Sequence, residues 1–447
     1  LHTAYRRQRQ MCIRDRGMSY FHSVTLDKDK CRGCTNCIKR CPTEAIRVRG
    51  GKAKIIKGRC IDCGECIRVC PYHAKRAVTD DFEELKNYKY NIALPAPSLY
   101  GQFSDVSDIN VILTGLLKIG FDDVFEVARG AEYISAATKE IYKKRSGSKP
   151  FISSACPAVI RLIRVRFPNL IDSIIDLISP METAGRLARK EAVQKTGLKN
   201  EEIGVFFITP CPAKMTSIKS PLTLDKSEIS GAISVNDVFA KLFPIIGDIK
   251  EPKALMKSSL SGVYWSRSGG EADGAAIENY IAVDGIENVI KILEEIEDDK
   301  VSGIDFIELS ACLGGCVGGV LNVVNSYVAK NHIKNISKTL HNRPCETKDI
   351  DLGSLSCSKK LEYEPVMELD DDFDKAMEMM DELEEIYDSL PQLDCGSCGA
   401  PSCKALAEDI VRGFADESFC IVNMKAKVQE LATELLASDK DNREEEE

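Results

Sequence analysis

The sequence lacks several features that would place it in a common class of protein. It holds one Trp and five His among 447 residues, and aromatic residues make up only 6%. It has no apolar run of the roughly 18 residues that a membrane-spanning helix requires. The body of the chain has no basic stretch and the formal net charge is −9, so nucleic acid would find no electrostatic footprint. We therefore expect neither a membrane span nor a nucleic-acid partner.

The first 17 residues differ from the rest of the chain. They are rich in Arg, lack an apolar stretch and end just before Met18. The pair Arg6 and Arg7 resembles a twin-arginine export signal, but no apolar region follows it. We interpret residues 1–17 as a non-native read-through or tag-like segment and leave them out of the prediction. The remaining chain is more acidic and keeps 18 of the 19 cysteines.

Eighteen cysteines are the main positive signal. A secreted disulfide scaffold is short and carries a signal peptide, whereas this chain is long and shows none, so metal-bound thiolates are favoured. Eight of these cysteines form two copies of one run, C-x2-C-x2-C-x3-C-P, which is the signature of bacterial ferredoxins that hold two [4Fe–4S] clusters. The fourth cysteine of each run crosses over, which assigns one cluster to Cys31, Cys34, Cys37 and Cys70 and the other to Cys60, Cys63, Cys66 and Cys41. Structural zinc is the alternative.

A third set of cysteines lies near the C-terminus, in a glycine-containing segment that can wrap a cluster. The set is Cys395, Cys398, Cys403 and Cys420. It resembles the small four-cysteine iron–sulfur domain of Rnf-type electron-transfer and corrinoid proteins. Zinc remains an alternative here too, because a single set is less specific than a doubled one.

Four further cysteines are isolated in the sequence. Cys156, Cys211 and the pair Cys312 and Cys316 each follow a short apolar stretch, at 150–152, 205–208 and 304–309. Residues just past the carboxyl ends of strands in an α/β sheet converge on one crevice, so these thiols can meet. The spacing of Cys312 and Cys316 predicts that both lie on one face of a helix. The alternative is that all four are ordinary buried cysteines.

The surroundings of these cysteines resemble a known family. The segments SSACPA at 153–158, TPCPAK at 209–214 and ELSACLGGCVGG at 308–319 resemble, in order, the three H-cluster motifs of [FeFe]-hydrogenases. The segment Ala96, Pro97 and Ser98 resembles the one that lines the diiron cyanide pocket. The resemblance implies that Cys156, Cys211, Cys312 and Cys316 hold a [4Fe–4S] cubane.

The resemblance also assigns roles within the pocket. Cys316 bridges to a diiron subsite that carries CO, cyanide and a dithiolate bridge, and maturation proteins must supply that subsite. Lys214 donates hydrogen bonds to a cyanide, and Ala155 and Ser310 line the pocket. The protein itself contributes orientation, proton delivery and electron supply.

Several positions depart from the family pattern. Efficient members carry a proton-relay cysteine where this chain has Ala155, and a methyl group cannot pass a proton. The upstream acidic relay is missing, because no carboxylate lies between Glu132 and Glu140. Thr209 and Ser310 stand where methionines are expected. With these departures, the chain resembles the branch of the family that is regarded as sensory.

The predicted fold class is α+β multidomain. It comprises a 2[4Fe–4S] ferredoxin domain at 18–80, a two-lobed α/β H-cluster domain at 90–365, a helical four-cysteine domain at 366–437 and an acidic tail at 438–447. Within the third part, apolar residues at helical spacing from Phe373 to Tyr387 predict a helix that packs on a core or an interface. Cys345 and Cys357 are left over and are interpreted as buried thiols. The histidines show no ligand spacing.

The functional expectation is a slow [FeFe]-hydrogenase that reacts reversibly with H2. One alternative is an H2 or redox sensor that signals to a partner chain. The other is an electron-transfer or assembly protein that lacks the diiron subsite. We expect a ferredoxin or flavodoxin as electron partner and the cytoplasm of an anaerobe as location, because thiolate-bound clusters need a reducing environment.

Overall fold

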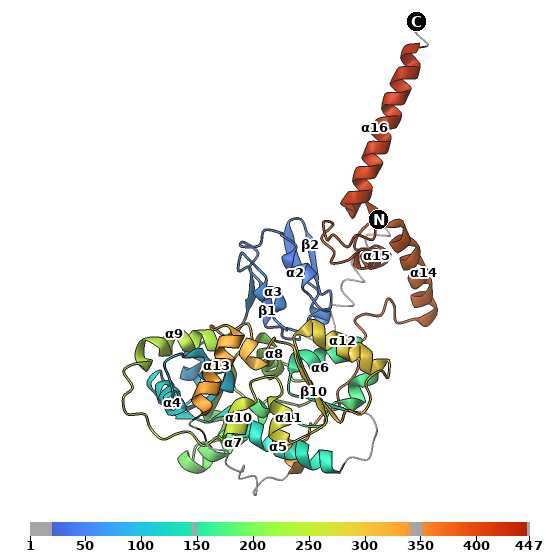
Figure 1. Cartoon of the computed structure of the whole chain (residues 1–447). Coiled ribbons are helices and arrows are strands. Elements are labelled where there is room, and N and C mark those ends of the chain that lie inside the picture. The colour runs from blue at the N-terminus through green and yellow to red at the C-terminus, as the bar shows by residue number, and fades with distance from the viewer. Residues whose placement is uncertain (1–19, 145–149, 339, 341–351, 445–447) are drawn as a thin grey trace.

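The computed structural model describes residues 20–144, 150–338, 340 and 352–444. Figure 1 shows a small head in blue, a large α/β body below it and a helical C-terminal part beside the head. This is the α+β multidomain architecture that the sequence predicts, with an α/β body. None of the described helices is both long enough and apolar enough to cross a membrane.

The head is built from two similar halves, each with one cysteine run. Strand β1 (Val24–Leu26) pairs antiparallel with β4 (Lys75–Ala77), and β2 (Ile46–Arg49) pairs antiparallel with β3 (Lys52–Ile55). The short helices α2 (Asn36–Lys39) and α3 (Glu65–Arg68) each carry the third cysteine of a run. Cysteines replace many of the large side chains of an ordinary core, since Cys31, Cys37 and Cys66 are buried among the head's few apolar residues.

The first lobe of the body has a four-stranded parallel sheet in the order β6-β5-β8-β9. The strands are β6 (Asp123–Val124), β5 (Tyr90–Pro95), β8 (Ile203–Thr209) and β9 (Gly231–Ser234). All seven residues of β8 are buried because helices cover both faces of the sheet. Phe206 and Ile208 pack toward α4 (Ile109–Lys118) and α9 (Val235–Ile246), and Val205 and Phe207 pack toward α7 (Pro180–Thr196) and α8 (Pro212–Lys219).

The second lobe has a three-stranded parallel sheet in the order β10-β11-β7. The strands are β10 (Tyr280–Asp284), β11 (Phe306–Ser310) and β7 (Phe151–Ile152). Ile307 and Leu309 pack against α6 (Pro157–Arg166) and α12 (Ile286–Glu297), while Phe306 packs against α11 (Gly270–Ala275) on the other face. The remaining helices of the body are α5 (Val127–Lys143), α10 (Leu260–Tyr264) and α13 (Ser326–Ser337). The two separate sheets give the predicted two lobes.

Short 3₁₀ helices join these elements. They are η1 (Lys57–Arg59), η2 (Phe82–Asn87), η3 (Pro97–Gln102), η4 (Pro168–Ser173), η5 (Asn200–Glu202), η6 (Cys316–Gly318), η7 (Leu352–Leu355) and η8 (Glu417–Phe419). Segment η2 leads from the head into the body, where the Asp80 carboxylate just before it accepts a 2.8 Å hydrogen bond from the Ala232 amide. The segment between the head and the body is therefore fastened to the edge strand β9.

The C-terminal part consists of α14 (Phe373–Ser389), α15 (Cys403–Val411) and α16 (Ile421–Glu444). Helix α14 contains all the residues of the predicted apolar stripe, but they are divided between two faces of the helix. Leu383, Ile386 and Tyr387 pack on α15, whereas Phe373 and Met377 are exposed. Helix α16 continues into the segment expected to be an acidic tail, as far as Glu444.

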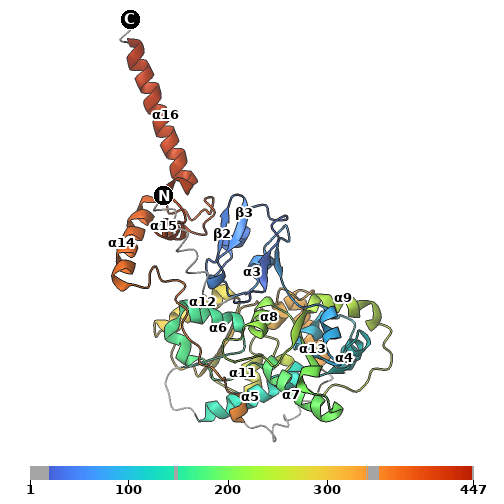
Figure 2. The same ribbon diagram turned by 180° about the vertical axis from the view of Figure 1, so that it is seen from behind.

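The C-terminal part is docked on the head by buried charges. Asp409 accepts hydrogen bonds from Arg47 Nε at 2.8 Å and from Arg49 Nη2 at 2.7 Å. Arg59, which is also buried, pairs with Glu408 through Nη1 and Oε2 at 3.0 Å. The two parts lie side by side in both views (Figures 1 and 2). Buried pairs of this kind fix one relative orientation, because separating them would leave unpaired charges in a poorly solvated interface.

Candidate metal centres

The three motif segments of the body follow the carboxyl ends of three strands. Cys156 is the N-cap residue of α6 and follows β7, and Cys211 is the N-cap residue of α8 and follows β8. Cys312 and Cys316 lie in the loop after β11. A Pro at the first position of α6 and of α8 starts each helix directly after the cysteine, where a missing amide hydrogen does no harm. Both lobes thus direct thiols toward their shared crevice.

The four thiols are electrostatic neighbours. Burial raises the pKa of the Cys211 thiol to about 11, an effect that the Lys214 ammonium opposes and that Cys316 and Cys156 reinforce. Burial also raises the pKa of Cys312, with Cys211 and Cys156 acting in the same direction. Four thiols gathered in one place are the donor set expected of a metal cluster.

The expectation that Cys312 and Cys316 share a helix face is wrong. Gly314 and Gly315 between them have positive φ angles of 85° and 90°, which no right-handed helix contains. The segment forms a tight loop, and the short helix η6 begins only at Cys316. A Cβ at Gly315 would lie 2.7 Å from the backbone nitrogen of Ser268. The glycines therefore let the loop press against a neighbouring segment.

Lys214 lies on α8, one turn after Cys211, and its half-buried side chain lies among the thiols. Its Nζ atom lies 3.5 Å from the Sγ atom of Cys316. Burial by itself would lower the pKa of this ammonium, but the surrounding cysteines, with Cys316 first, outweigh burial and raise it. The side chain is thus a fixed positive charge at the thiol that the sequence assigns to the diiron subsite.

The predicted pocket segment follows the carboxyl end of β5, beside β8. Ala96 precedes η3, and Pro97 and Ser98 begin it. The Ser98 hydroxyl is fully buried and has no hydrogen-bond partner within the described ranges of the chain. An unpaired buried hydroxyl is rare in native proteins. It is the kind of donor that a polar exogenous group would satisfy.

Thr209 and Ala155 have defined local roles. The Thr209 hydroxyl donates to the carbonyl of Cys211 at 2.8 Å and accepts from its amide at 3.3 Å, so it braces the turn that presents this thiol. The amide of Ala155 donates to the Ser153 hydroxyl at 3.2 Å. Ser310 is the last residue of β11, and its carbonyl accepts a bond from Gly285 at 3.0 Å.

The sequence analysis missed two buried carboxyl groups beside the first motif. Ser153 donates its hydroxyl hydrogen to Glu271 on α11 at 2.5 Å. Glu308 on β11 accepts hydrogen bonds from the amides of Gly269, Glu271 and Ala272 at 2.9 to 3.1 Å. Burial raises the pKa of both carboxyl groups, and the nearby Glu308 raises that of Glu271 further. The available signal was Glu308 among the apolar residues 306–309.

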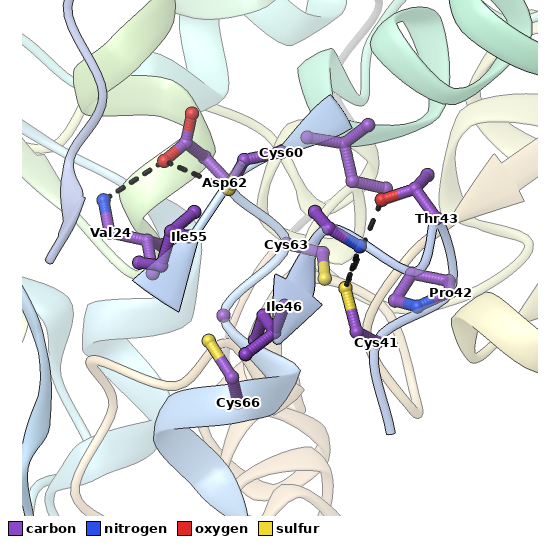
Figure 3. A pocket seen from close by; sticks show the side chains of 13 residues that line it. Val24, Cys41, Pro42, Thr43, Ile46, Ile55, Cys60, Asp62, Cys63 and Cys66 are labelled. Atoms are coloured by element: carbon purple, nitrogen blue, oxygen red, sulfur yellow. Dashed lines mark hydrogen bonds between the residues drawn. The ribbon is translucent and has the colours of Figure 1, made fainter. Parts of the chain in front are cut away.

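The eight cysteines of the head form the two groups that the crossover rule predicts. Cys41, Cys60, Cys63 and Cys66 line one cavity (Figure 3), and Cys31, Cys34, Cys37 and Cys70 line the other. The crossing cysteines are held alike, because the Ala45 amide donates to Cys41 Sγ at 3.2 Å and the Ala74 amide donates to Cys70 Sγ at 3.3 Å. Amide–sulfur hydrogen bonds of this kind stabilise cluster thiolates.

The C-terminal cysteines also gather in one place. Cys398, Cys403 and Cys420 belong to a single packed cluster, and the exposed Cys395 is close enough to act electrostatically on Cys398. Cys403 opens α15, and Cys420 immediately precedes α16. The four sequence-predicted sets are thus each brought together by the fold.

The segments that carry the different cysteine sets are also in contact with one another. A Cβ at Gly64, next to Cys63, would meet Val320 and Pro212 of the body at 2.6 and 3.3 Å. On the far side of the head, the Val48 amide donates to the Gly399 carbonyl of the C-terminal part at 2.8 Å. Val48 lines the cavity of Cys31 and its group. The order in space is therefore C-terminal set, first head group, second head group, body set.

The remaining candidates have structural partners. His22 Nδ1 lies 2.8 Å from Asp62 Oδ2, and the same carboxylate accepts a bond from the Val24 amide at 2.9 Å (Figure 3). Burial raises the pKa of Cys357 to about 11, and the thiol packs against the cluster that contains Leu355. Cys345, His341 and residues 1–17 lie outside the described residues.

Comparison with known families accounts for most of the chain. The family described as "Iron only hydrogenase large subunit, C-terminal domain" matches residues 89–244 and 248–320, just over half of the chain. A 4Fe-4S dicluster domain matches residues 23–71, and the FeS cluster family matches residues 390–422.

Individual relatives are distant. Iron hydrogenase 1 of Clostridium pasteurianum is 24% identical in an alignment of 372 residues that covers 66% of this chain and 64% of the relative. A cytosolic Fe-S cluster assembly factor NAR1 homolog of Schizosaccharomyces japonicus is 27% identical in an alignment of 135 residues that covers 27% of this chain and 25% of that protein. This chain therefore spans less than two thirds of either relative.

Solved structures support the fold. A single-residue variant of [FeFe]-hydrogenase HydA1 from Chlamydomonas reinhardtii matches with a TM-score of 0.50 and 14% identity, over 64% of this chain and 98% of that one. With the family match over the two lobes and their cysteine-bearing loops, the conclusion is that the chain belongs to the family of iron-only hydrogenase large subunits.

Proposed function

We propose that this protein reacts reversibly with H2 (2 H⁺ + 2 e⁻ = H2) at an H-cluster held by Cys156, Cys211, Cys312 and Cys316. The observation that carries the proposal is the placement of the Lys214 ammonium 3.5 Å from Cys316 Sγ, inside a group of four half-buried thiols. An assembly site for a plain cubane has no need of a cation held at one particular thiol.

The residues present fit the implied cofactor. Four thiols supply the ligands of a cubane, and Cys316 is the one beside the cation. The unpaired hydroxyl of Ser98 and the ammonium of Lys214 offer hydrogen-bond donors to anionic cyanide ligands, and such charge-assisted bonds are strong in a desolvated site. When bound, the diiron subsite would supply the redox chemistry of H2, which no side chain can perform.

Proton delivery falls to the chain's own residues. Ala155 cannot carry a proton, but Glu271 has a raised pKa and shares a hydrogen bond with Ser153, whose hydroxyl also accepts the Ala155 amide. We assign to Glu271 the role of holding a proton near the pocket and to Glu308 the role of exchanging it with Glu271. A relay that ends at a serine three residues from Cys156 is less direct than a cysteine beside the ligand, so we expect slow turnover.

Electron supply is assigned to the other cysteine sets. The head groups and the C-terminal set would hold three accessory [4Fe–4S] clusters. Their order in space runs from the C-terminal set to the body set. A ferredoxin or flavodoxin in the cytoplasm is the proposed electron partner.

A second candidate function is H2 or redox sensing through a partner chain. The observation in its favour is Ala155, which stands where a fast enzyme of this family carries a proton-relay cysteine. A sensor needs the metal ligands and a pocket for H2 but gains nothing from rapid turnover. Slow turnover with intact ligands is expected of both candidates.

Infrared spectroscopy of the anaerobic protein, matured with the diiron cofactor, tests the proposal. CO and cyanide bands that shift when argon is replaced by H2 are expected. Absence of the bands, with maturation verified on an active control enzyme, would leave an electron-transfer or assembly protein of the NAR1 kind.

The variant Ala155→Cys then tests whether the missing relay cysteine is the cause of the slow turnover. A relay cysteine typically contributes about 10² to 10⁴ in rate, so the variant should be faster by a measurable part of that factor. Turnover that stays at the wild-type level would show that the missing cysteine is not the cause of the slow rate.

A further inference from the structure

Helix α16 is the largest element of the described structure that is not covered by another helix or by a sheet. In both views it points away from the head and the body (Figures 1 and 2). Its base is fixed by the buried Cys420 and by a 3.1 Å hydrogen bond from Asn423 Nδ2 to the Ser389 carbonyl at the end of α14. The rest of the helix is exposed to solvent up to residue 435, which is the last residue of α16 whose side chain is described.

The exposed surface of α16 is not uniformly polar. Ile421, Met424, Val428 and Leu431 are between 47% and 58% exposed, and Leu435 is 68% exposed. Their spacings are three, four, three and four residues, which places them in a single stripe along the helix. Such a narrow stripe, with a 3.5-residue repeat, is the seam of a two-stranded coiled coil rather than the broad face of a helix that packs on a globular core.

We propose that α16 pairs with α16 of a second copy of this chain in an antiparallel coiled coil. Val428 would pack against Leu431 of the partner subunit and Met424 against Leu435 of the partner subunit, each contact occurring twice through a two-fold axis. The helix is about 36 Å long at 1.5 Å per residue, so these layers occupy its central part. The proposal does not depend on the nature of the metal centres.

Charge complementarity selects the antiparallel arrangement and its register. Lys427 and Glu434 flank the stripe at equivalent positions seven residues apart. In the proposed register, Lys427 lies beside Glu434 of the partner subunit, and the two-fold axis repeats this attractive pair. A register one heptad nearer the base would place Lys427 beside Lys427 of the partner subunit. A parallel pair would place Lys427 beside Ala432 of the partner subunit and gain nothing.

Sedimentation velocity of the anaerobic, cluster-loaded full chain tests the pairing. The wild type should form a reversible dimer whose fraction grows with concentration, because only four apolar layers are buried. Leu431→Asp should abolish the dimer, whereas Thr433→Asp, which adds the same charge on the opposite side of the helix, should not. Visible absorption of the clusters checks that both variants are folded. A wild type that stays monomeric at the highest soluble concentration would overturn the proposal.

A charge exchange tests the orientation. Lys427→Glu alone and Glu434→Lys alone should each weaken the dimer, since each places like charges together. An equimolar mixture of the two single variants should dimerise as well as the wild type, because every flanking pair in the mixed dimer is again attractive. If the mixture dimerises no better than the separate variants, the antiparallel arrangement is wrong.

Discussion

Glu271 accepts a hydrogen bond from the Ser153 hydroxyl, and Ser153 is three residues from the predicted cluster ligand Cys156. The carboxyl group comes from α11, more than a hundred residues further along the chain. The protein therefore has a buried acid near the pocket, although the acidic relay upstream of the first motif is missing.

Replacing this acid should slow proton transfer. We expect Glu271→Gln to lower H2 turnover of the matured protein by about 10² or more, because Gln accepts the same hydrogen bond but carries no exchangeable acidic proton. The exposed Glu278→Gln is the matched control. Iron content and the infrared bands of both variants should equal those of the wild type. Turnover within twofold of wild type in Glu271→Gln would remove Glu271 from the relay.

The same acid should make stability depend on pH. The folded pKa of Glu271 lies above the ordinary value of about 4.3, so between these two values the folded state binds more protons than the unfolded state. Stability from this group is therefore lost as pH rises toward the folded pKa. Thermal unfolding midpoints from about pH 6 to pH 9 should fall less in Glu271→Gln than in the wild type or in Glu278→Gln. Parallel curves for all three proteins would contradict the raised pKa.

The docking of the C-terminal part should depend on Asp409. Asp409→Asn leaves the buried Arg47 without its anionic partner, and breaking a buried pair in this way costs about 3–5 kcal/mol. The amide of Val48, which bonds to Gly399 across this interface, should then exchange its hydrogen faster. Asp381→Asn on the exposed side of α14 is the control and should leave Val48 protected. Unchanged exchange in both variants would show that the ion pairs are not needed for docking.

A comparison of two glycines with positive φ angles should separate the effect of steric crowding from the effect of backbone strain. Gly315 has backbone atoms of Arg267 and Ser268 within 2.8 Å of its missing Cβ, whereas Gly303, at φ 72°, has nothing within 4 Å. Gly303→Ala should cost only the left-handed strain of about 1–2 kcal/mol. Gly315→Ala should also displace the loop of Cys312 and Cys316. Iron analysis should show about four fewer iron atoms per chain in Gly315→Ala and none lost in Gly303→Ala.

Residue pattern alone predicted the features whose signal is local in the sequence. The two head groups follow from the repeated four-cysteine run, and the convergence of Cys156, Cys211 and Cys312 follows from their positions after apolar strands. Helix α14 follows from its apolar spacing and from Asp372, which caps it by accepting the Lys375 amide. In each case a local rule was enough, because the signal did not depend on a distant partner.

Features that depend on distant contacts could not be predicted. The left-handed glycines between Cys312 and Cys316 override a helical spacing because the loop must pass Ser268. The partnership of Glu271 with Ser153 joins segments 118 residues apart, and no local pattern links the two residues. The docking of Arg47 on Asp409 likewise joins segments 362 residues apart.

The position of Cys420 gives α16 the properties of a lever. The residue is buried with the other C-terminal cysteines, and the helix starts at the next position. A rod about 36 Å long that is anchored at its base beside one thiol converts a small rotation of the base into a large displacement of its tip, and a force on the tip into torque at the base. A partner that binds the far end of α16 is therefore mechanically connected to the outermost cysteine set.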